Sequence, residues 1–165
     1  VNSNGTAVDL DSAGVNFRDY QRFVLNMKYY LPAGRKSAIE LDANIGYNLH
    51  YNESVVNGYL VGGMANVARN QVPFVGLYEG EVITPRIGAM QVAWQYEFLR
   101  NVFAIPRVGA AVYDGEISGG SRYKYLSGYG LGAGYSSRLG PVEATMMYND
   151  QSGRLKFYVN LGFNF

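Results

Sequence analysis

The chain has 165 residues, a formal net charge of +1 and no cysteine. The length indicates a single domain, and the lack of cysteine excludes a disulfide framework and a thiolate zinc site. The near-neutral charge gives no electrostatic reason to expect nucleic acid as a partner. The 15 tyrosines and 21 glycines favour strands and turns over helices. The sequence has no run of 18 consecutive apolar residues, so no membrane-spanning helix is predicted.

Apolar and polar residues alternate with a period of two along most of the chain, which predicts β-strands. The seven predicted strands cover residues 17–31, 38–51, 86–99, 102–114, 125–138, 141–149 and 154–165. A weaker alternation at 6–11 is a candidate for an eighth strand. All seven exceed the average soluble strand of about 5–6 residues and reach or approach the about 9–11 residues that cross a membrane.

The connections favour antiparallel hairpins. Short turns are expected at 32–37, 138–141 and 149–153, whereas 114–125 is long and polar. The connection 52–85 is longer still and apolar near 72–78, so we expect it to fold back onto the sheet, inside the lumen of a barrel. Short turns combined with long loops are typical of membrane barrels.

The fold class expected is all-β, an antiparallel transmembrane β-barrel in which the apolar face meets lipid and the polar face lines the lumen. Aromatic residues gather near the strand ends, as an interfacial girdle requires. They are Tyr29, Tyr30, Tyr47, Tyr51, Phe98, Tyr148, Phe163 and Phe165. The same alternation also fits a soluble barrel with an apolar interior, and that alternative stays open.

Charged residues of both signs lie on the polar face and are expected to form compensated pairs in a wet lumen. The candidates are Arg18, Arg22, Lys28, Glu40, Asp42, Glu97, Arg107, Glu143 and Lys156. Arg18 or Arg22 is expected to balance the neighbouring carboxylates of Glu40 and Asp42. The only histidine, His50, has no second histidine to complete a metal site or a triad. No catalytic, metal or cofactor site is therefore expected in this segment.

Glycines 128, 130, 132 and 134 share one face of a predicted strand. No helix is expected to follow them, so they do not form a phosphate-binding loop. Their bare face would let a loop, a plug or strong curvature approach the strand closely.

The order of several short motifs resembles the C-terminal half of a BamA-like outer-membrane barrel of the bacterial surface antigen type. They are LVGG (60–63), PFVGL (73–77), IGAMQVAWQYEF (87–98), RVGAAVYDG (107–115), SGYGLGAGYSSRLGPVEATMMYND (127–150) and KFYVNLGFNF (156–165). Among such barrels the chain is most similar to those that follow patatin-like phospholipases of Bacteroidetes. That resemblance implies an upstream hydrolase with a G-x-S-x-G motif, which these 165 residues lack.

The resemblance implies a barrel of about sixteen strands in the outer membrane of a Gram-negative bacterium. It implies a lumen loop that includes Gly62, Gly63, Phe74, Gly76 and Leu77. It also implies a C-terminal signal for the barrel-assembly machinery, formed by Phe157, Phe163 and Phe165. Assembly and secretion members carry a loop arginine paired with a strand aspartate; here Val75 and Arg107 stand near those places. Arg69 is a candidate substitute cation.

The function expected is that of a membrane anchor or pore, extending to the anchor or translocator of a patatin-like hydrolase. Expected partners are the lipid bilayer, the assembly machinery and further barrel strands from the same or another chain. One alternative is a complete eight-stranded structural or adhesive barrel. Another is a soluble barrel that binds an apolar ligand.

Overall fold

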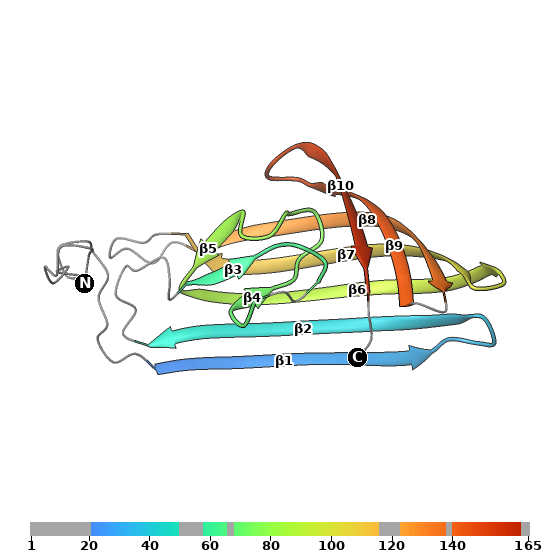
Figure 1. Ribbon diagram of the computed structural model, residues 1–165. Helices are drawn as coiled ribbons and strands as arrows, with labels where there is room; N and C mark the ends of the chain where they lie inside the picture. Colours follow the sequence, from blue (N-terminus) through green and yellow to red (C-terminus); the bar gives the residue numbers. More distant parts are fainter. Residues whose placement is uncertain (1–20, 50–57, 66–67, 116–122, 138–139, 163–165) are drawn as a thin grey trace, which may run out of the picture.

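The computed structural model describes residues 21–49, 58–65, 68–115, 123–137 and 140–162 (Figure 1). The candidate strand at 6–11, His50 and three predicted site residues, Arg18, Phe163 and Phe165, lie outside these ranges. No helix in the described ranges is long and apolar enough to cross a membrane.

Seven long strands form one antiparallel sheet, which confirms the predicted fold class. They are β1 (Gln21–Pro32), β2 (Ser37–Leu49), β6 (Arg86–Leu99), β7 (Val102–Asp114), β8 (Tyr123–Ser137), β9 (Gly140–Asn149) and β10 (Arg154–Leu161). Their order is β1-β2-β6-β7-β8-β9-β10, so each long strand lies beside its neighbour in the chain once the three short strands are set aside. The sheet is strongly curved in Figure 1. Within the described residues, β1 and β10 do not pair with each other.

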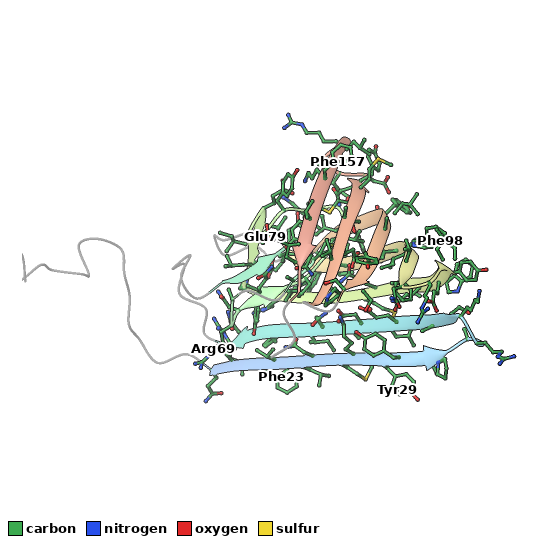
Figure 2. The ribbon with its side chains drawn as sticks, turned by 45° about the vertical axis from the view of Figure 1, so that its right-hand side comes forward. Phe23, Tyr29, Arg69, Glu79, Phe98 and Phe157 are labelled. Carbon is green, nitrogen blue, oxygen red and sulfur yellow. The ribbon has the colours of Figure 1, made fainter. Side chains whose placement is uncertain are left out.

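Exposure separates the two faces of the sheet as the alternation predicts. Large apolar side chains on one face are exposed in every long strand, and Figure 2 shows Phe23 and Tyr29 projecting from β1 on that side. Examples are Leu25, Ile45, Trp94, Val108, Leu131, Met146 and Val159. The opposite face carries small and polar residues such as Asn44, Ala93, Gly132 and Thr145, and is largely buried.

The connection between β2 and β6 forms a second, small sheet. It consists of β3 (Tyr59–Val61), β4 (Gln71–Val72) and β5 (Val82–Thr84). Strand β3 lies in the middle, parallel to β4 and antiparallel to β5. Figure 1 shows this small sheet on the concave side of the seven-stranded sheet, at the end where β2 finishes and β6 begins.

The two ends of the large sheet differ. The connections β1–β2, β6–β7 and β8–β9 lie at one end, and each spans a few residues. At the other end β2, β7 and β9 finish and β6, β8 and β10 begin, and the sequence between β2 and β6 and between β7 and β8 is longer. In bacterial barrels short turns face the periplasm and long loops face outward. Below, the two ends are called the short-turn end and the long-loop end.

Candidate functional site

The described part of the β2–β6 connection, residues 58–65 and 68–85, packs on the inner face at the long-loop end and is here called the inner loop. Its apolar side chains form a core with strand residues of the large sheet. The buried members are Tyr59, Val61, Val72, Phe74, Leu77, Ile87, Ala89, Ala111 and Leu126. Phe74 and Val75 are both 0% exposed, so the loop is a packed part of the fold.

Glycines on β7 and β8 are what allow the inner loop to come so close. A Cβ atom at Gly128 would overlap the carbonyl oxygen of Val75, and one at Gly130 would lie 2.7 Å from Val75 Cγ2. A Cβ atom at Gly109 would lie 3.1 Å from Val75 Cγ1. The loop backbone therefore rests where the strands have no side chains. The predicted close approach to the glycine row is confirmed at 128 and 130.

Polar contacts fix the same stretch of the loop to β6 and β9. The Gln91 amide accepts a hydrogen bond from Val75 N at 2.7 Å and donates one to Pro73 O at 2.9 Å. Gly76 N donates to Met147 Sδ at 3.3 Å. Gly76 has φ 93° and a Cβ there would lie 2.5 Å from Tyr148 O, so glycine is required on two counts.

Other loop residues reach the remaining strands. The Tyr59 ring covers Gly46 of β2, and its hydroxyl donates to Phe23 O of β1 at 2.9 Å. The Thr84 hydroxyl donates to Asp114 O of β7 at 2.8 Å. On β10, Lys156 pairs with the loop residue Glu81. The inner loop thus contacts all seven long strands.

The inner face nearer the short-turn end carries a cluster of paired charges. Lys28 Nζ lies 2.8 Å from Glu40 and 4.0 Å from Asp42. Arg107 Nη2 donates to both carboxylate oxygens of Glu143, at 2.8 and 2.9 Å, and Arg107 Nη1 lies 4.0 Å from Glu40. The cluster spans β1, β2, β7 and β9.

Small residues on the intervening strands make this cluster possible. Ala93 of β6 stands between Glu40 and Arg107 in the register. Gly132 of β8 leaves room for the Glu143 carboxylate, because a Cβ there would lie 2.9 Å from Glu143 Oε1. Long charged side chains can therefore meet across a strand that has almost no side chain of its own.

Two cavities adjoin the charge cluster. One, of about 280 Å³, lies between the strands and the loop, where Gly63, Met64 and Pro73 form part of its wall. The other, of about 230 Å³, extends towards Pro141 and Glu143 at the short-turn end. Glu40, Ala93 and Arg107 line both. The inner face is thus filled by the loop at one end and is hollow and charged at the other.

Several predicted site residues lie apart from this cluster. The Arg22 side chain is at the long-loop end, where its Nε donates to Asn48 Oδ1 at 3.3 Å. Glu97 lies near the β6–β7 turn and accepts a hydrogen bond from Asn101 N at 2.9 Å. Arg69 is exposed (Figure 2). Phe157 is exposed on the outer face of β10.

The remaining loop residues that the sequence suggested are joined to one another. Gly62 N donates to Val72 O at 3.0 Å, and Gly63 N donates to Leu77 O at 2.8 Å. Gly63 O accepts from Phe74 N at 3.0 Å. Two residues important for seating the loop, Gln91 and Tyr59, were not predicted, because each resembled an ordinary member of an alternating strand or loop.

Comparison with protein families gives a match over nearly the whole chain. A family model described as OMP85 superfamily matches residues 6–165. The chain belongs to the OMP85 superfamily. Searches among curated proteins and among solved structures found no match.

Membership of the OMP85 superfamily indicates which face of the sheet meets lipid. These proteins are β-barrels of the bacterial outer membrane, so the exposed apolar rows of the seven long strands face the bilayer. The loop-covered face is then the inner one. The superfamily consists of transport and assembly barrels.

Proposed function

We propose that this segment is the C-terminal part of a larger outer-membrane barrel of a Gram-negative bacterium, and that it serves as a membrane anchor whose lumen is occupied by the inner loop. The observation that carries the proposal is the contact of one loop with all seven long strands. A barrel used as an open pore needs a clear lumen, whereas here Val61, Phe74 and Val75 are fully buried between loop and sheet.

The free edges of the sheet support a larger barrel. Strands β1 and β10 each pair on one side only within the described residues. In lipid, each unpaired backbone group costs several kcal/mol, so the two edges must be covered by further strands. These strands come from the same chain or from another one, and the barrel-assembly machinery engages the C-terminal strand.

The cargo of the anchor is proposed from the motif resemblance. The order LVGG, PFVGL and NLGF is similar to barrels that follow patatin-like phospholipases. In that arrangement the hydrolase precedes the barrel, and the barrel holds or translocates it at the membrane. Because the inner loop is packed in the lumen, it supports a barrel that holds the hydrolase at the membrane more than one that transports material continuously.

The complete reading frame and the detergent requirement of its product test the proposal. We expect additional alternating strands and a G-x-S-x-G motif upstream, and a full-length protein that leaves the membrane only with detergent and shifts in gel mobility when heated. A frame that encodes only a signal peptide and these residues would favour the complete eight-stranded barrel instead. A product that is soluble without detergent would reject every membrane role.

A further inference from the structure

Four consecutive residues of the inner loop, Tyr78–Glu81, lie against β10. We propose that this segment, here called the clamp, fixes the register of β10 by binding three successive residues of that strand. The proposal concerns how β10 is held, and it stands whether the barrel works as an anchor or as a pore.

The strongest contact of the clamp is an ion pair in a buried position. The Glu81 carboxylate pairs with Lys156 Nζ, and the Lys156 side chain is only 7% exposed. The same carboxylate accepts a hydrogen bond from Tyr78 N at 3.1 Å, which holds it in place. Lys156 Nζ also lies 5.4 Å from the centre of the Tyr78 ring. The ammonium group therefore finds both a negative charge and an aromatic face at one position.

The next two residues of β10 are bound as well. The Tyr78 hydroxyl donates to Phe157 O at 3.3 Å. The Tyr158 hydroxyl donates to Glu79 Oε1 at 2.6 Å. Three bonds to three consecutive residues specify one alignment of the strand with the loop.

The LVGG motif makes room for the clamp. A Cβ atom at Gly62 would overlap the carbonyl oxygen of Tyr78, and one at Gly63 would lie 2.7 Å from Glu79 Cγ. Both glycines have positive φ, 120° and 78°. The two glycines thus let the clamp pack directly against the end of β3, where any side chain would displace it.

The side-chain pattern of β10 does not by itself specify the register of the strand. Its outward row is uniformly apolar, comprising Leu155, Phe157, Val159 and Leu161. A slip of one residue would turn this row inward, but a slip of two would keep every apolar side chain in lipid. Within the described residues β10 pairs only with β9, so the turn at 150–153 and the clamp are the features there that oppose such a slip. After a two-residue slip, Arg154 or Tyr158 would take the place of Lys156, and the clamp would lose its partners.

Cysteine cross-linking in the full-length protein, in native outer membranes and with any upstream cysteine replaced, tests the proposal. The pair Met146→Cys with Phe157→Cys reports the observed register, since these residues are direct partners. The pair Tyr148→Cys with Phe157→Cys reports a two-residue slip. In the observed register Tyr148 is the partner of Leu155, and a slip of two residues would place Phe157 there instead. An otherwise unchanged protein is expected to cross-link efficiently only through the first pair.

The clamp variant is Glu81→Gln, and the matched control is Arg154→Met, which removes an exposed charge from the same strand. We expect the slipped cross-link to rise about tenfold in Glu81→Gln, because the largely buried Lys156 ammonium loses the negative charge that pairs with it, and to stay unchanged in the control. Tyr158→Phe, which removes one hydroxyl, should give a smaller rise. Equal slipped cross-linking in Glu81→Gln and Arg154→Met would overturn the proposal. If Glu81→Gln does not accumulate in the membrane, an unchanged pattern in Tyr158→Phe would overturn it.

Discussion

Replacing Gly128 by alanine should release the inner loop from the sheet. The added Cβ atom would overlap the carbonyl oxygen of Val75, and backbone lies on both sides of the contact. Overpacking of a well-packed site costs about 1–3 kcal/mol. The backbones of β8 and of the inner loop cannot rotate out of the contact as a side chain could. We therefore expect a cost at the upper end of this range, about 3 kcal/mol. This corresponds to a fall of about 100-fold in the ratio of seated to displaced loop.

Amide hydrogen exchange of the full-length protein in detergent measures this ratio. The amides of Val75 and Gly76 bind Gln91 and Met147 when the loop is seated. Their protection should fall by about 100-fold in Gly128→Ala, in line with the free-energy estimate. Gly88→Ala is the matched control, because a Cβ at Gly88 of β6 would meet nothing within 4 Å. Equal protection of residues 72–78 in both variants would refute the proposed packing.

Three further changes test other parts of the structure. Gln91→Leu leaves two loop backbone groups without their partner, so the temperature of the heat-dependent gel shift should fall, by an amount equivalent to about 2–4 kcal/mol. Glu143→Gln should destabilise the protein to urea by up to about 3–5 kcal/mol, because it leaves the Arg107 charge without its main partner; adding Arg107→Met should recover part of this loss. Leu131→Arg, in the middle of the lipid-facing row, should cost about 2–4 kcal/mol and reduce membrane insertion, whereas Leu99→Arg at the hairpin end should cost about 0–1 kcal/mol. Equal insertion of the two arginine variants would contradict the assignment of the outer face.

The long strands could be predicted because their signal is local. The expected strands 86–99 and 102–114 have the same bounds as β6 and β7, and the other long strands differ by a few residues at their ends. In most of them a more buried face, rich in polar or small residues, opposes an exposed apolar one, and the alternation of the sequence follows from this; β1 is exposed on both faces. The three short strands of the inner loop could not be predicted, because they have two or three residues each and pair only with one another.

The pairing of charges was only partly predictable. Arg18 or Arg22 was expected to balance Glu40 and Asp42; Arg18 lies outside the described residues, and the observed partner of both carboxylates is Lys28. The register of β1 with β2 places Lys28 opposite Asp42 and Arg22 opposite Asn48. A tight hairpin fixes the register of its two strands. Counting residues along both strands from the turn at 33–36 would therefore have identified Lys28 as the partner of Asp42.

Contacts between distant parts of the chain could not be predicted from the sequence. The glycine row predicted that something would approach β8, but it did not identify Val75 as the residue that does so. Arg107 and Glu143 are 36 residues apart, and they meet because Gly132 leaves the space between them open. Such pairs depend on the order and register of several strands together.

The position of the two faces relative to lipid is tested most directly by spin labels at two neighbouring sites. Leu131 of β8 is 56% exposed on the outer row, whereas Thr145 of β9 is buried on the inner face. Nitroxides attached to cysteines at these positions, in the full-length protein in lipid vesicles, report their accessibility to oxygen and to a water-soluble nickel chelate. We predict high oxygen and low nickel accessibility at position 131, and low oxygen accessibility at 145. Ready access of the nickel chelate to position 131 would contradict the account.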